Sequence, residues 1–154
     1  MGIEKFEEAN QHFKVAVEHN PEDARIFLSY AIALSRVGEI EEAITNYEKS
    51  LALDPEDLTT LNNLAWILAT APKPELRNGQ RALILAEKLC KKTNYEIPNG
   101  LDTLAASCAQ AGQFKQAVTY ATKSLSMTKK NDPKRNIRTI LLQMYKEDKS
   151  FPFR

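Results

Sequence analysis

The sequence predicts an all-α protein, a right-handed α-solenoid of antiparallel helix pairs that ends in a C-terminal capping helix. Two observations carry this prediction. Apolar residues recur at helical spacing along most of the chain, and one motif returns after 34 residues. The 154-residue chain also contains only five Gly and seven Pro, which leaves little room for long loops.

The repeated motif is visible at the start of the chain. The stretch FEEANQHFKVAVEHNPED (residues 6–23) recurs 34 residues later as IEEAITNYEKSLALDPED (residues 40–57). Residues 3–23 match only the second helix of a helix pair. We therefore expect the chain to begin half-way through a repeat and to be a piece of a longer protein, with Met1-Gly2 left by a cloning site.

The first complete repeat spans residues 24–57 and contains two apolar helical runs separated at Gly38. Glycine permits the tight turn that antiparallel helices need. Ala31 and Ala43 are small residues where the two helices must approach each other, and Pro55 ends the second helix. This pattern predicts a helix pair that stacks on its neighbours.

The pattern resembles the tetratricopeptide repeat family, which it matches at Phe27, Tyr30, Ala31, Leu34, Gly38, Ala43, Tyr47 and Pro55. Further copies cover residues 58–97 and 98–131, and a final apolar stripe predicts a capping helix over residues 133–149. The resemblance therefore implies a single repeat domain over residues 1–154. In the 58–97 copy the turn, at residues 71–79, is five residues longer than in the others, and two prolines stiffen it.

Residue types that carry catalysis are sparse. His12 and His19 lie seven residues apart, whereas two metal ligands on one helix are best placed about three or four residues apart. Cys90 and Cys108 match no metal or redox spacing, so we expect buried structural thiols and leave open whether they are bonded. The sequence predicts no enzyme active site in this chain, no metal and no cofactor.

Charge is distributed unevenly along the chain. Residues 1–57 carry 5 basic and 13 acidic side chains, residues 58–122 carry 7 and 4, and residues 123–154 carry 9 and 3. We interpret one basic cluster as a solvated helix end, because few aromatic residues interleave it for base stacking; it consists of Lys129, Lys130, Lys134, Arg135 and Arg138. Nucleic acid is not an expected partner. No apolar run is long enough for direct membrane insertion.

The resemblance implies a concave groove lined by the first helix of each repeat, which would bind a protein or peptide. The groove positions carried over to this chain are Arg25, Leu28, Ile32, Arg36, Asn62, Asn63, Trp66, Thr70, Asp102, Thr103 and Gln110, with Asn99 at one more. Trp66 would provide an apolar contact surface, or would instead pack under the long turn. The positions that clamp a chaperone tail in the family hold no cation here; they are Leu28, Ile32, Asn63, Asn99 and Thr103.

Self-association is a further hypothesis. The half repeat at the start leaves Phe6, Phe13 and Val17 without a partner helix, and the acidic and basic parts of the chain are complementary. A second copy could cover this face in a homodimer.

The leading functional hypothesis is a non-catalytic interaction scaffold. One alternative is an accessory domain that presents acceptor protein to a bacterial protein O-glycosyltransferase, because the last repeats and the cap resemble the C-terminal repeat region of such large bacterial proteins. Another is a purely structural oligomerisation element. A free-standing protein would be cytoplasmic and a glycosyltransferase domain extracytoplasmic, and the sequence leaves the compartment open.

Overall fold

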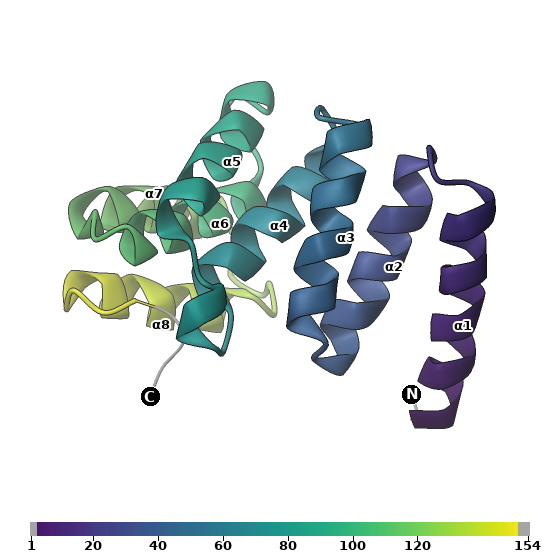
Figure 1. The fold of residues 1–154 in the computed structure, drawn as a ribbon. Coiled ribbons are helices and arrows are strands. Elements are labelled where there is room, and N and C mark those ends of the chain that lie inside the picture. The colour runs from purple at the N-terminus through teal and green to yellow at the C-terminus, as the bar shows by residue number, and fades with distance from the viewer. Residues whose placement is uncertain (1–2, 151–154) are drawn as a thin grey trace. The chain divides into compact units, whose positions relative to one another are not determined.

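The computed structural model describes the backbone of residues 3–150 and the side chains of residues 8–150. Within this range the fold consists of helices and contains no strand, which confirms the all-α prediction (Figure 1). The elements are α1 (Ile3–His19), α2 (Ala24–Val37), α3 (Ile40–Leu53), α4 (Leu58–Thr70), the short 3₁₀ helix η1 (Pro74–Leu76), α5 (Gly79–Lys92), α6 (Pro98–Gln110), α7 (Phe114–Ser126) and α8 (Arg135–Lys146).

Contacts between residues group into two compact units, residues 1–60 and 61–154. The boundary between the two units falls inside α4, and the single repeat domain over residues 1–154 stays a prediction. The formal charges follow the same boundary: 5 basic and 13 acidic side chains give the first unit a net charge of −8, and 16 basic and 7 acidic side chains give the second +9.

The first unit is built on the helix pair α2 and α3, with α1 packed against α2 (Figure 1). Gly38 ends α2 in the left-handed conformation, at a φ of 91°, and Glu39 N–H donates to the Leu34 carbonyl, so the chain reverses into α3. The Asp23 carboxylate caps the start of α2. The core of the pair is formed by Phe27, Tyr30, Ala31, Leu34, Ala43 and Tyr47.

The same contact between a serine hydroxyl and a backbone carbonyl occurs in two of the repeats. In the first unit the Ser50 hydroxyl, on α3, donates to the Ala24 carbonyl at the start of α2, over 2.9 Å. In the second unit the Ser124 hydroxyl oxygen, on α7, lies 3.1 Å from the Pro98 carbonyl oxygen at the start of α6, and the Asp102 carboxylate is a second, closer acceptor for its one hydrogen. The two pairs occupy equivalent positions in their repeats, so a small hydroxyl residue lies where the two helices of a pair meet.

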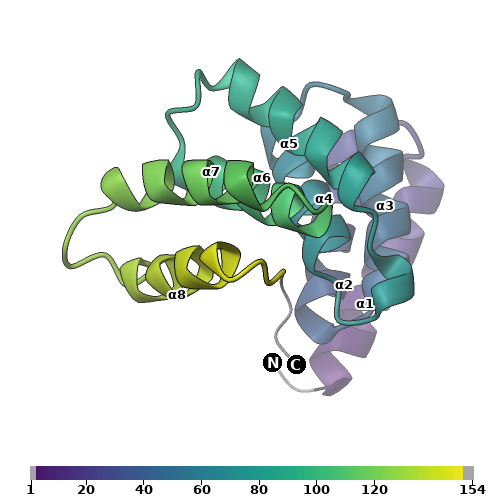
Figure 2. The ribbon, with the colours of Figure 1, turned by 90° about the vertical axis from the view of Figure 1, so that its left-hand side faces the viewer.

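The second unit stacks α5, α6, α7 and α8 in order, each against the next, and Figure 2 shows α8 running alongside α7. Alanine occupies the positions of closest helix approach, at Ala65, Ala82, Ala105 and Ala117, and all four are buried. Leu61, Leu64, Leu101, Leu104 and Tyr145 fill the space between the helices. None of the helices in the described part of the chain is long and apolar enough to span a bilayer.

The long turn between α4 and α5 is held by its own hydrogen bonds. The Arg77 guanidinium folds back and donates to the carbonyls of Ala71, over 2.6 Å, and Pro72, over 3.1 Å. The Asn78 N–H donates to the Leu68 carbonyl on α4, and the Asn78 side chain caps the start of α5. The five additional residues therefore form a defined connection.

Gly79 explains how this turn meets the next repeat. A Cβ atom at this position would lie 2.8 Å from the Gln110 carbonyl group and 2.9 Å from the Ala111 nitrogen. These are backbone atoms at the C-terminal end of α6, which cannot move aside cheaply. Glycine is therefore required because the start of α5 lies directly against the end of α6.

We predict that Gly79→Ala lowers the free energy of unfolding by about 1–3 kcal/mol, because the added methyl group overlaps the α6 backbone. Helix propensity alone would give the opposite sign, since Ala is favoured over Gly by about 1 kcal/mol in a helix. Urea unfolding followed by circular dichroism measures the difference, with Gln80→Ala, at an exposed position, as the control. A stabilised Gly79→Ala variant would contradict the close approach.

Candidate peptide-binding pocket

A pocket of 470 Å³ opens in the second unit between α4, α6 and α8. Its lining combines amide, aromatic, aliphatic and charged side chains: Asn62, Asn63, Trp66, Asn99, Asp102, Thr103, Lys134, Ile137, Arg138 and Leu141. Of the predicted groove residues, the structure brings together Asn62, Asn63, Trp66, Asp102 and Thr103, and Asn99 joins them. The residues of α8 were not among those predicted to line the groove.

The capping helix lines the pocket as the first helix of a further repeat would. On α6 the pocket residues Asn99 and Thr103 lie four positions apart, and the same spacing separates Lys134, the N-cap residue of α8, from Arg138 on α8. Residues four apart lie on one face of a helix. The spacing is visible in the sequence, where Lys134 precedes the apolar stripe of the cap and Arg138 lies within it.

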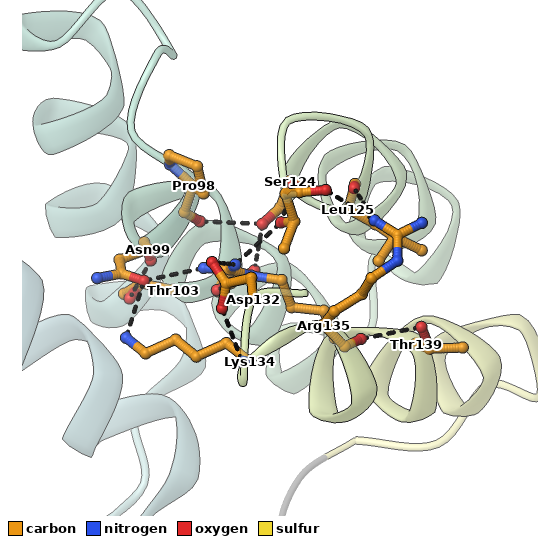
Figure 3. Close-up of polar contacts among 12 residues, drawn as sticks. Pro98, Asn99, Thr103, Ser124, Leu125, Asp132, Lys134, Arg135 and Thr139 are labelled. Carbon is orange, nitrogen blue, oxygen red and sulfur yellow. Dashed lines mark hydrogen bonds and ion pairs between the residues drawn. The ribbon is translucent and has the colours of Figure 1, made fainter. Parts of the chain in front are cut away.

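Arg138 holds α8 in this position. Its side chain is only 4% exposed, and each guanidinium nitrogen donates a hydrogen bond: Nε to Asp102 over 2.8 Å, Nη1 to Thr128 over 2.9 Å and Nη2 to Asn99 over 2.9 Å. Figure 3 shows the surrounding polar contacts, with Asn99, Ser124 and Lys134 labelled. A buried guanidinium needs several such partners, because its desolvation is expensive.

The interpretation of the basic cluster as a solvated helix end is wrong for Arg138, which is buried. Arg135 is also engaged: its guanidinium donates to the Thr128 carbonyl over 2.7 Å, just beyond the last turn of α7. A cation is favourable at this helix end, where carbonyl groups lack helical partners. Lys129 and Lys130 are exposed, as interpreted.

Asp102 is the carboxylate at the centre of this network. One oxygen accepts from Arg138, and the other accepts from the Ser124 hydroxyl over 2.5 Å. Burial raises the pKa of the Asp102 carboxyl above its ordinary value, whereas the hydrogen bonds from Ser124 and Arg138 act in the opposite direction. Asp102 therefore joins α6 to α7 and α8, and both of its oxygens are occupied inside the protein.

The amide side chains at the pocket form a second, smaller network. The Thr103 hydroxyl donates to Asn62 Oδ1 over 2.9 Å, and Asn62 Nδ2 donates to Asn63 Oδ1 over 3.3 Å. Lys134 reaches from α8 to Asn99 Oδ1 over 3.1 Å, as Figure 3 shows. Trp66 lines the same pocket from α4, so its side chain lies with the amides.

The remaining predicted groove residues lie elsewhere. Thr70 is buried and donates to the Trp66 carbonyl within α4, and Gln110 is half-buried at the end of α6. Four more belong to the first unit, namely Arg25, Leu28, Ile32 and Arg36. Among these four, Leu28 and Ile32 are half-buried, and the Arg25 guanidinium pairs with Asp23 over 2.8 Å.

The residues predicted for self-association lie on α1. Phe13 is half-buried and stacks on Tyr30 of α2, with ring centroids 5.1 Å apart, and Val17 is also half-buried. Val15, which the sequence analysis did not single out, is 52% exposed. The side chain of Phe6 lies outside the described residues.

The two cysteines are free thiols buried in the second unit. Burial raises the pKa of Cys90 to about 11 and that of Cys108 to about 12. A thiol that keeps its proton at neutral pH is a poor nucleophile. Among residues 8–150, no three His, Cys, Asp or Glu side chains cluster closely enough to hold a metal ion.

Comparisons with known proteins agree with the helical repeat fold. The family model described as Tetratricopeptide repeat matches residues 24–57. This match and those that follow support the tetratricopeptide repeat family. The chain is 26% identical over 129 residues to the Caenorhabditis elegans "Tetratricopeptide repeat-containing protein trd-1". The aligned residues make up 82% of this chain and 16% of the relative.

Two further similarities concern a shorter segment and the fold. The wheat (Triticum aestivum) "Hsp70-Hsp90 organizing protein" is 35% identical over 52 residues, 34% of this chain and 9% of that protein. The chain therefore spans less than a fifth of either curated relative. The crystal structure of MamA protein superimposes with a TM-score of 0.74 at 15% identity, covering 94% of this chain and 73% of MamA, which shows a shared repeat fold.

We predict that Arg138→Leu lowers the free energy of unfolding by about 3 kcal/mol or more, because it leaves the Asp102 carboxylate buried without a cation. The double variant Asp102→Leu/Arg138→Leu should lose less than Arg138→Leu alone, since it removes both charges. Urea unfolding of the two single variants and the double variant gives the coupling energy. Lys129→Leu, at an exposed position, is the control, and additive losses at Asp102 and Arg138 would show that the pair is not coupled.

Proposed function

We propose that this chain is a non-catalytic protein-interaction scaffold whose pocket between α4, α6 and α8 holds an extended segment of a partner protein. The observation that carries the proposal is the convergence of Trp66 with the amides of Asn62, Asn63 and Asn99 in one pocket. Amide side chains match the hydrogen-bonding groups of a peptide backbone. An indole ring offers a broad apolar surface for a partner side chain.

The character of the rest of the pocket supports the same proposal. Ile137 and Leu141 from α8 face the amides of α4 and α6, so the pocket combines polar and apolar contacts along its length. This mixture is typical of sites that bind peptides in an extended form. The wheat relative carries a name that says it organises two other proteins, Hsp70 and Hsp90, and we extend protein binding from it to this chain.

Self-association is a second proposal, favoured by the segregation of charge into a first unit of −8 and a second unit of +9. The first unit of one copy would attract the second unit of another. The accessory role in a protein O-glycosyltransferase remains a proposal that rests on sequence resemblance alone. Membrane spans encoded ahead of residue 1 in the parent gene would favour it.

We predict that peptides selected on this protein bind through the pocket. Random nine-residue segments would be displayed and selected, and their affinities measured by fluorescence anisotropy. Asn63→Ala and Trp66→Ala should each weaken binding roughly tenfold or more, because each removes a central contact. Ile84→Ala, on α5 and 68% exposed, is the control and should leave the affinity unchanged. Selected peptides that bind both pocket variants as well as the original protein would overturn the proposal.

For self-association we predict a mass above that of the monomer by static light scattering at low salt, about 0.05 M, and a decrease towards the monomer at about 0.5 M, where charges are screened. An association that does not respond to salt would instead indicate apolar contacts, such as those of Val15 on α1. A monomer at all concentrations and both salt levels would exclude this second proposal.

A further inference from the structure

The asparagines of the pocket differ in which of their amide atoms already form hydrogen bonds within the protein, and residue types alone do not indicate this. Every side-chain oxygen of its three asparagines already accepts a hydrogen bond within the protein. Asn62 Oδ1 accepts from Thr103, Asn63 Oδ1 from Asn62, and Asn99 Oδ1 from both Arg138 and Lys134. The orientation of Asn99 follows from chemistry, because arginine and lysine can only donate and must therefore face its oxygen.

The groups that remain for a ligand are donors. Among the residues whose side chains the structure describes, none accepts a hydrogen bond from Asn63 Nδ2 or Asn99 Nδ2. The Lys134 ammonium group has three N–H bonds, and among the described residues it donates one hydrogen bond, to Asn99. The pocket therefore offers N–H groups to a ligand that supplies oxygen acceptors.

The pocket also carries a cation that makes no ion pair. Arg138 pairs with Asp102 over 2.8 Å and lies 3.8 Å from the Asp132 carboxylate, whereas the Lys134 ammonium group forms no ion pair with a described carboxylate. Lys134 therefore presents its ammonium group at the edge of the pocket, in a unit whose formal charge is +9. A ligand of negative charge is favoured at this place.

We infer that the pocket recognises an internal segment of a partner protein that carries an Asp or Glu side chain next to an apolar one. The carboxylate would accept from Lys134 and Asn99, and the apolar neighbour would lie against Trp66 and Ile137. A C-terminal carboxylate fits less well, because it calls for converging cations and all three nitrogens of Arg138 are already hydrogen-bonded. This inference rests on the proposed function, since it names the chemistry of the segment that the same pocket would hold.

The test uses the full chain and two displayed libraries of random nine-residue segments. In one library each segment joins two folded domains, so that it has no free carboxylate, and in the other it ends the displayed protein. We expect binders from the internal library, with Asp or Glu enriched at one position. Selection on Lys134→Gln should remove this enrichment, whereas Lys129→Gln, an exposed lysine outside the pocket, should retain it.

One selected peptide with blocked termini then gives a quantitative answer by fluorescence anisotropy. Replacing its acidic residue by the amide should weaken binding roughly tenfold, as expected for a charge-assisted hydrogen bond. On Lys134→Gln the acidic and amide peptides should bind with nearly equal affinity. Circular dichroism would verify that the variant is folded.

The outcomes separate this inference from the proposed function. Binders without acidic enrichment that still lose affinity on Trp66→Ala would overturn the inference and leave the groove function intact. Binders from the terminal library alone would indicate a C-terminal carboxylate and overturn the inference in the same way. An absence of binders from both libraries would overturn the proposed function itself.

Discussion

The buried ion pair between Arg138 and Asp102 is the interaction on which the second unit depends. It joins α8 to α6, and through the Ser124 hydroxyl it also engages α7. Three helices therefore meet at one carboxylate. Because an unpaired charge at this place would be expensive, the pair favours the arrangement in which α8 lines the pocket.

The same network determines the chemistry of the pocket. Arg138 orients Asn99 by occupying its side-chain oxygen, and Thr103 forms a hydrogen bond with Asn62 across α6 and α4. The residues that join the helices thus also determine which N–H groups remain available in the pocket. In the proposed function Arg138 would act indirectly, by holding Asn99, because each of its guanidinium nitrogens already donates a hydrogen bond within the protein.

The boundary between the two units coincides with a reversal of charge. The unit of residues 1–60 is acidic and the unit of residues 61–154 is basic, although the whole chain carries a net charge of only +1. Average composition therefore conceals the property that most affects association with charged partners. Each unit nevertheless uses the same local device, a left-handed glycine after the first helix of a helix pair: Gly38 follows α2 and Gly112 follows α6.

The sequence by itself determined the helical repeats. Their 34-residue period, the small residues at Ala31, Ala43 and Ala105, and the turn at Gly38 are local features that a reader of the sequence can recognise. The family resemblance also predicted that Asn63, Trp66 and Thr103 line the same groove. The sequence did not reveal the role of the capping helix, because Arg138 resembles any surface cation until its partners are known. Only the tertiary structure decided that Arg138 is buried and paired, whereas the Lys134 ammonium group forms no ion pair with a described carboxylate. The physical reason is that the partners of Arg138 on α6 lie more than thirty positions away in the sequence.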